Sequence, residues 1–330
     1  MLIKISTDVQ PHTEATIKLK GLPEEFNGET YIRISFKIRE STEWSPAGTE
    51  VAFGQHQLRG PESLATIQSL LPVLSSVPTI KVASPGLLQV TSPDGSSVWG
   101  VDLSLGTLSS WQKTGGPGRQ LTTKPFTIDF YRAVTDNDGG CHFGRNWRDR
   151  RLHQTKHHVR QVNWSVKPSG LVIEITGRIA PPVLAWGVDT KLTLTFGHGV
   201  HIKLTAKPHG PLLPQTFARV GLTFGLEGVE EVRWFGRGPG ESYSDKKMSQ
   251  AFGLWQSTVD DLFVDYEYPQ DGGNRTDVRW VEFLGKPDEG ESADVGSRKR
   301  LIRAKFLRAG NAPHYQLKTD QKFEYELFLD

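Results

Sequence analysis

The sequence lacks several features that would place a protein at once in an extracellular or membrane class. It has one cysteine, Cys141, which excludes an intramolecular disulfide and favours a reducing compartment. No apolar run approaches the roughly 20 residues that a membrane-spanning helix needs. The first residues do not show the charged segment, apolar run and small-residue cleavage site of a signal peptide. We therefore expect a cytoplasmic protein without a membrane partner.

An excess of charge of one sign is also lacking. The 39 basic and 37 acidic residues give a net charge of +2, so no overall field would attract nucleic acid, and we expect no nucleic-acid partner. His157 with His158, and His198 with His201, have no third ligand at a recognisable spacing, and one cysteine cannot complete a thiolate zinc site. The sequence predicts no metal site and no cofactor in this chain.

Aromatic residues and glycine are abundant instead. Nine Trp, 16 Phe and seven Tyr accompany 34 Gly and 20 Pro, a composition that favours β-structure. Residues 31–39 alternate strictly between apolar and polar side chains, which predicts a half-buried strand. Residues 16–20 and 50–54 predict two more. So few strands cannot form a complete sandwich, and residues 1–58 are interpreted as the C-terminal part of a β-sandwich domain.

Residues 79–330 show a longer series of strands separated by turn signals. One hairpin is predicted around Asp94 and Gly95, and another around residues 197–199. Antiparallel hairpins recur without any alternation of strand and helix, so this part is predicted to be an all-β, multi-stranded sandwich. Residues 59–78 contain three prolines, of which Pro72 and Pro78 limit any helix, and are predicted to be a linker with at most a short helix.

Two glycine-containing loops hold residues that could carry chemistry. Residues 135–140 place Asp, Asn and Asp before two glycines and could bind a cation through oxygen atoms. The later acidic ligands of a calcium loop are missing, and a turn in which Asp and Asn bond their own backbone is favoured. Residues 236–241 could cradle a phosphate, but Pro239 removes a backbone donor and no Gly-Lys-Ser/Thr follows.

Glu241 and Asp245 form the best candidate pair for a hydrolytic reaction on two carboxylic acids. A retaining glycosidase needs its carboxyl groups about 5–5.5 Å apart, and an inverting one about 6.5–9.5 Å. Residues four apart reach such a separation only on a helix face, whereas this segment has the composition of a loop. The pair is therefore predicted not to be catalytic. Most of the tryptophans are expected in the core, although any of them could stack on a sugar ring.

Three motifs resemble the C-terminal small-chain domain of β-galactosidases of glycoside hydrolase family 2. They lie at residues 130–138, 234–247 and 266–280. The resemblance implies that the motif residues line the rim of a carbohydrate pocket: Arg132, Thr135, Asp136, Asn137, Asp138, Trp234, Gly236, Gly238, Pro239, Glu241, Tyr243, Asp245, Pro269 and Gln270. Gly240 and Ser244 depart from the family, which usually has His or Gln and Pro there, and this puts the rigidity of the loop in doubt.

The resemblance also implies a fold and a role. Residues 79–330 would form the large antiparallel supersandwich of galactose-mutarotase-like domains, and residues 1–58 part of an immunoglobulin-like sandwich. The family's catalytic carboxylates lie on a TIM barrel that is not present here, and its Mg and Na ions are bound mainly elsewhere. The chain would be the C-terminal portion or small chain of a β-galactosidase acting on lactose. It would be inactive alone, would need a barrel-bearing large chain, and would be oligomeric when complete.

The similarity lapses between residue 283 and residue 314. Residues 297–308 contain six basic residues with apolar ones between them, which by themselves suggest an amphipathic helix for an anionic surface. The favoured interpretation is that residues 284–313 replace family strands, are divergent and lack order. The tryptophan with which bacterial members reach the galactose pocket has no counterpart here. Two alternatives remain open: a stand-alone galactoside-binding module, or a fragment without function.

Overall fold

The computed structural model describes residues 9–10, 12–61, 77–114, 119–168, 170–286, 298–308 and 322–330. The chain divides into two compact units, Met1–Glu62 and Ser63–Asp330, which are described separately. Strands dominate both units. No helix among the described residues is long and apolar enough to cross a membrane.

The first unit contains one antiparallel hairpin, formed by β1 (Thr30–Lys37) and β2 (Glu50–Arg59). Ile34 pairs with Gly54 and Phe36 with Ala52, and side chains on this face remain exposed, to 42% at Ile34 and 58% at Phe36. The strands predicted at 31–39 and 50–54 are thus confirmed. The strand predicted at 16–20 is wrong: these residues have no partner strand among the described residues, and a strand is stable only when a neighbour satisfies its backbone.

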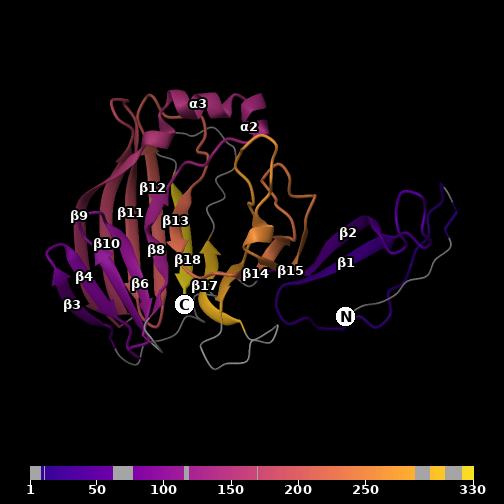
Figure 1. The fold of residues 1–330 in the computed structure, drawn as a ribbon, viewed down its shortest axis with the longest axis horizontal. Coiled ribbons are helices and arrows are strands. Elements are labelled where there is room, and N and C mark those ends of the chain that lie inside the picture. The colour runs from indigo at the N-terminus through magenta and orange to yellow at the C-terminus, as the bar shows by residue number, and fades with distance from the viewer. Residues whose placement is uncertain are drawn as a thin grey trace. The chain divides into compact units, whose positions relative to one another are not determined.

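The second unit is built on a nine-stranded and a five-stranded antiparallel sheet (Figure 1). The larger has the order β15 (Ala251–Thr258), β14 (Glu231–Gly238), β16 (Trp280–Gly285), β17 (Lys299–Arg308), β18 (Phe323–Leu329), β12 (Val200–His209), β11 (Gly187–Phe196), β10 (Gly170–Ala180) and β9 (Lys156–Lys167). The smaller contains β3 (Thr79–Ser84), β4 (Leu87–Thr91), β5 (Ser97–Asp102), β6 (Thr107–Lys113) and β7 (Arg119–Gln120), and beside it β8 (Thr122–Asp129) pairs with β13 (Gly221–Leu226).

Tight turns of the predicted type join neighbouring strands. Between β4 and β5, Gly95 has a φ of +71°, and the Asp94 carboxylate accepts hydrogen bonds from the Ser92 hydroxyl at 2.6 Å and the Ser96 backbone N–H at 3.0 Å. The bond from Ser92 is the largest of the effects that lower the pKa of Asp94 to about 2. A second turn at residues 197–199 joins β11 to β12. Both predicted hairpins are confirmed.

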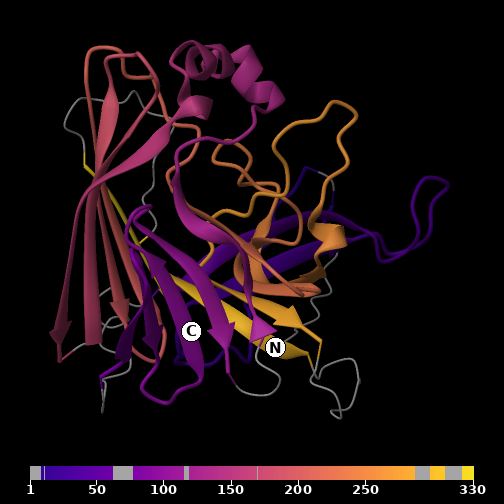
Figure 2. The same cartoon turned by 60° about the vertical axis from the view of Figure 1, so that its left-hand side comes forward.

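The main core lies between the two sheets (Figure 2). Trp99 from the smaller sheet contacts Trp111 edge to face at 5.8 Å and Phe196 of the larger sheet at 5.4 Å, and all three are fully buried. A second apolar cluster surrounds Phe130 and Trp147 near the short helices. The predicted all-β sandwich is confirmed.

The segment predicted to lack order contains a central strand. Residues 299–308 form β17, paired with β16 on one side and β18 on the other. Ile302 and Ala304 face the core, so Arg303 between them lies on the opposite face of the sheet, and the interpretation as a helix is wrong. The expectation of disorder is wrong for residues 284–285 and 299–308, which lie in paired strands of the sheet. Residues 287–297 and 309–313 of the segment, and residues 62–76 of the predicted linker, lie outside the described residues.

Candidate functional site

Three connections meet at one end of the second unit, where the short helices lie beside the loops that follow β14 and β15 (Figures 1 and 2). They are residues 130–149, 239–250 and 263–279, and together we name them the loop cluster. The first contains α2 (Asp136–Gly140) and α3 (Phe143–Asp149), and the third begins after the short helix η2 (Asp260–Leu262). The three motifs singled out in the sequence contribute to these connections.

Helix α2 begins with a capping box. The Thr135 side chain accepts a hydrogen bond from the Asp138 backbone N–H, and the Asp138 carboxylate accepts one from the Thr135 backbone N–H at 2.8 Å. Each residue thereby satisfies a backbone donor at the start of the helix. The predicted turn is thus replaced by a single turn of helix, although its side chains do bond to their own backbone as expected.

Asp138 also forms a buried ion pair with Arg132. Arg132 donates from one nitrogen at 2.6 Å and from the other at 3.2 Å, and the side chains are only 8% and 4% exposed. The Arg132 guanidinium carbon lies 5.3 Å from the ring centre of Trp147 and 5.7 Å from that of Tyr243. Burial opposes ionisation of Asp138, but the hydrogen bonds from Arg132 and Thr135 outweigh it and lower its pKa.

Further hydrogen bonds tie α2 to the other two connections. The Asn137 side-chain amide donates to Asp245 at 2.8 Å. The Asp136 backbone N–H donates to Gln270 at 3.0 Å, and the Gln270 amide donates back to the Asp136 carboxylate at 3.2 Å. These residues are exposed or half-buried, so this part of the cluster faces solvent.

A tyrosine links the second connection to the third. The Tyr243 hydroxyl donates to Asp271 at 2.8 Å, and the Asp271 backbone N–H donates to the carbonyl of Val134 in the first connection. Burial, followed by the hydrogen bond to Asp271, raises the pKa of Tyr243. Tyr243 therefore touches both Arg132 and Asp271, and holds the three connections together.

Glu241 is a buried carboxylate with three donors. It accepts from the Lys246 ammonium at 2.8 Å, from the Tyr266 hydroxyl by a short hydrogen bond, and from the Gly273 backbone N–H at 3.0 Å. Burial opposes its ionisation, but these donors, led by Lys246, outweigh burial and lower its pKa. An ionised, fully bonded carboxylate cannot donate a proton near neutral pH. Glu241 therefore links the second connection to the third through hydrogen bonds.

At the end of β14, where the second connection begins, neighbouring residues leave no room for a side chain at Gly236 or Gly238. A Cβ added to Gly236 would lie 2.8 Å from the Val278 Cα, and one added to Gly238 would lie 2.6 Å from the Trp255 ring. Below them, Arg275 lies over the ring of Trp234 at 5.4 Å and donates to the carbonyl of Pro239 at 3.0 Å. The two glycines of the motif are thus explained by the close packing of Val278 and Trp255 around them.

The two positions that depart from the family pattern do not leave this loop unsupported. The Gly240 backbone N–H donates to the Gln250 side chain at 2.7 Å, and Ser244 lies exposed. Close by, Asp277 accepts from Arg237 at 2.7 Å and from Lys247 at 2.8 Å. Burial opposes the ionisation of Asp277, but Lys247 and Arg237 lower its pKa overall.

The cluster contains functional partners that the sequence analysis did not single out. Lys246, Tyr266 and Asp271 hold Glu241 and Tyr243, and Asp277 holds Arg237. A signal was available, since each of them lies within or beside one of the three motifs. Pro269, which was singled out, lies exposed beside Gln270.

The acidic residues of α2 do not suit a metal ion. Asp138 is committed to Arg132 and Thr135, Asp136 bonds to Gln270, and the Asn137 amide donates to Asp245. Across the described part of the chain, no group of three His, Cys, Asp or Glu side chains is placed to hold a metal. The polar side chains of α2 are therefore occupied by protein partners.

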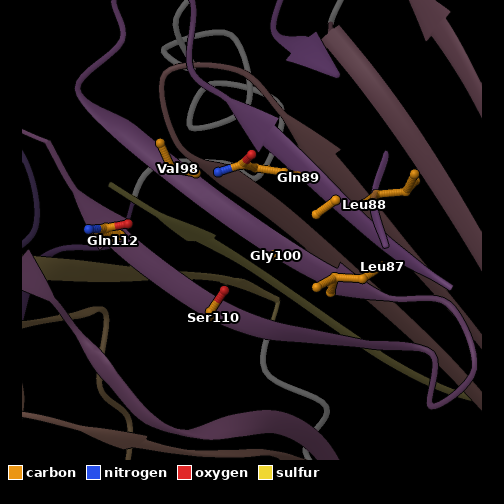
Figure 3. Close-up of a pocket in the computed structure, with 8 residues that line it drawn as sticks. Leu87, Leu88, Gln89, Val98, Gly100, Ser110 and Gln112 are labelled. Atoms are coloured by element: carbon orange, nitrogen blue, oxygen red, sulfur yellow. The ribbon is translucent and has the colours of Figure 1, made fainter. Parts of the chain in front are cut away.

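A shallow hollow lies elsewhere, on the five-stranded sheet (Figure 3). It measures about 150 Å³ and is lined by Ala83, Leu87, Leu88, Gln89, Val98, Gly100, Ser110 and Gln112. This volume is below the roughly 300 Å³ of ordinary ligand pockets, and the lining has neither an aromatic ring nor a charge. The loop cluster remains the stronger candidate for a functional site.

Comparison with known proteins assigns the family. The family described as "Beta galactosidase small chain" matches residues 94–329, which include every residue of the loop cluster. The chain belongs to this family. A second family, described as "Beta-galactosidase, domain 4", matches residues 3–59, the range that contains β1 and β2.

Individual relatives are β-galactosidases that are much longer than this chain. The protein of Kluyveromyces lactis is 32% identical over 246 residues, which cover 72% of this chain and 22% of that protein. The protein of Priestia megaterium is 25% identical, with 79% of this chain and 24% of the relative covered. The protein of Arthrobacter sp. is 27% identical, with 98% and 32% covered. The matched part of the chain thus spans 22–32% of the length of these relatives.

Proposed function

We propose that this chain is the C-terminal portion or small chain of a β-galactosidase, and that the complete enzyme hydrolyses terminal β-D-galactosides such as lactose. The family match to residues 94–329 carries this proposal. In this role the loop cluster walls one side of the sugar pocket, and the sandwich supports it. The exposed, unpaired Cys141 supports a cytoplasmic location.

The carboxylates of the loop cluster are suited to a structural role and not to catalysis. A retaining double displacement needs one carboxyl group that donates a proton and one that attacks the sugar. Asp138, Glu241 and Asp277 have lowered pKa values and bond to cations. Because they are ionised they cannot donate the proton, and because each is bonded to a cation none is free to attack the sugar. The carboxyl groups that cleave the bond are therefore proposed to lie on a barrel-bearing partner.

The test is to purify the chain and assay a chromogenic galactoside with and without a barrel-bearing large chain. We expect no turnover by the chain alone and a gain of activity on mixing. Enzymatic turnover by the chain alone would overturn the proposal. Binding of lactose by the chain without any gain on mixing would favour the stand-alone binding module, and neither result would favour a fragment without function.

A variant of the mixed enzyme tests the proposed wall. Asn137→Ala removes the bond between α2 and Asp245 at an exposed position, so the sandwich should still fold. We expect KM for the galactoside to rise severalfold. Arg160→Gln, which changes an exposed ion pair on β9, is the matched control and should leave KM unchanged. An unchanged KM in Asn137→Ala would show that the loop cluster does not contribute to the sugar site.

A further inference from the structure

The outer face of the nine-stranded sheet carries a cluster of cationic side chains. Ile302 and Ala304 of β17 belong to the apolar core. Arg303, between them, and Lys305, which follows Ala304, therefore point to the opposite face. The cluster, which we name the cationic face, consists of Arg233 on β14 and of Arg300, Arg303 and Lys305 on β17.

One buried carboxylate organises the guanidinium groups. Glu282 on β16 is 4% exposed and accepts from Arg233 at 2.9 and 2.5 Å. Its other oxygen lies 3.4 Å from Arg300 and 3.6 Å from Arg303. A single negative charge thus has three positive charges within ion-pair distance, so the guanidinium groups still repel one another.

A second carboxylate, that of Asp330, does not neutralise the remaining positive charge of the cationic face. Asp330 accepts from Arg303 at 2.9 Å and lies 4.0 Å from the Lys305 ammonium. Four cations therefore face two carboxylates, a surplus of two positive charges in this set. The neighbouring Arg298 and Lys286 do not change the balance, because Glu230 and Glu231 pair with them.

The surroundings of Lys305 strengthen its attraction for an anion. Its register partner on β16 is Trp280, which stacks on Phe235, and its ammonium lies 5.9 Å from the ring centre of Phe328. Burial lowers the pKa of Lys305, and the positive charge of Arg303 lowers it further. Electrostatic attraction is stronger beside such apolar groups than in open water. The side chains of Arg233 and Arg300 are 43% and 46% exposed and so accessible to an incoming ligand.

We propose that the cationic face is a binding site for a small oxyanion with two or more negative charges. Such a ligand neutralises the surplus of two charges, and the planar guanidinium groups of Arg233 and Arg300 match the paired oxygens of phosphate, sulfate or carboxylate groups. The residues of this site are not among those of the loop cluster, and the proposal does not depend on the proposed galactosidase activity.

The experiment titrates the purified full chain with inorganic pyrophosphate by calorimetry at constant ionic strength. We expect saturable binding of one ligand per chain, and a loss of affinity of at least tenfold in the Arg300→Gln, Lys305→Gln double variant. Arg160→Gln, which removes an exposed cation from β9 of the same sheet, is the matched control and should bind like the parent. Absence of saturable binding, or an equal loss in the control, would overturn the proposal.

A second variant separates an anion site from a purely structural ion cluster. Glu282→Gln removes the internal anion and raises the surplus to three charges. The proposal predicts severalfold tighter pyrophosphate binding, and a larger rise in Tm on adding pyrophosphate than the parent shows. A structural cluster predicts a lower Tm that the ligand does not restore, and this result would also overturn the proposal.

Discussion

Between the two sheets, side chains such as Trp99, Trp111 and Phe196 contact one another through apolar surface. In the loop cluster, residues such as Arg132 and Asp138 contact one another through charge-assisted hydrogen bonds. Apolar burial has no preferred direction and scales with area, whereas a buried charge depends on one partner at one distance. The interior should therefore respond to lost volume, and the loop cluster to lost charge or a shifted backbone.

Acidification should separate the two regions most strongly, because it acts on all the carboxylates of the loop cluster together. The folded-state pKa values of Asp138, Glu241 and Asp277 lie below their ordinary values of 3.8, 4.5 and 3.8. Their contribution to stability is present above those ordinary values and is lost as the pH falls through the lowered ones. We expect proteolysis to begin within residues 239–250 below about pH 4, while tryptophan fluorescence of the interior is still native.

This prediction has an internal control. Asp138→Asn removes one of the three carboxylates, so the free energy of unfolding should fall less between pH 5 and pH 3 than in the parent. An equal fall in both proteins would show that Asp138 does not contribute to the acid response.

Breaking the buried ion pair should be the most damaging single substitution in the loop cluster. Asp138→Ala leaves Arg132 buried without its partner, and the expected cost is about 3–5 kcal/mol in urea unfolding. Arg160→Ala, in an exposed pair, should cost less than about 1 kcal/mol. Similar losses in the two variants would refute the distinction between buried and exposed pairs.

A backbone contact should be the next most sensitive feature. In Gly236→Ala, the new Cβ would meet the Val278 backbone at 2.8 Å, and we expect a loss of about 1–3 kcal/mol. Gly139 in α2 has open space around it, so Gly139→Ala should be neutral or stabilise by a few tenths of a kcal/mol. Thermal unfolding of the two alanine variants measures the difference, and equal Tm values would show that the Val278 backbone yields.

The smallest expected effect is a difference in unfolding free energy between substitutions of two buried tryptophans, Trp99 and Trp111. The Trp111 indole N–H donates to the Ser97 hydroxyl at 3.3 Å, whereas that of Trp99 has no hydrogen-bond partner among the described residues. Both rings are fully buried. Trp111→Phe should therefore cost about 1 kcal/mol more than Trp99→Phe in urea unfolding. The reverse order would mean that ring shape outweighs hydrogen bonding even here.

The strands were largely predictable because their signals are local. The alternation in residues 31–39 and the Asp-Gly turn at Gly95 correspond to β1 and to the β4–β5 hairpin. The failures came where local signals were weak or misleading. Residues 16–20 alternate, but no strand in the described part of the chain pairs with them. Residues 299–308 resemble an amphipathic helix, although strands on both sides hold them in a sheet.

The candidate site was predictable as a set of motifs but not as a set of contacts. Arg132, Glu241 and Gln270 were singled out from the sequence. Tyr266, which bonds to Glu241, and Asp271, which bonds to Tyr243, were not singled out, because these hydrogen bonds join residues 25 and 28 positions apart. No local pattern specifies which of the many loop carboxylates will meet which donor.

The amino-acid sequence alone determined the all-β architecture, its main hairpins and the family, since these depend on side-chain alternation, turn chemistry and short motifs. Only the tertiary structure decided that Glu241 links two loops through hydrogen bonds, and that Arg300 and Arg303 of β17 lie within ion-pair distance of Glu282. The physical reason is that a charge changes its role with its burial and its partners, and both are set by long-range closure of the chain.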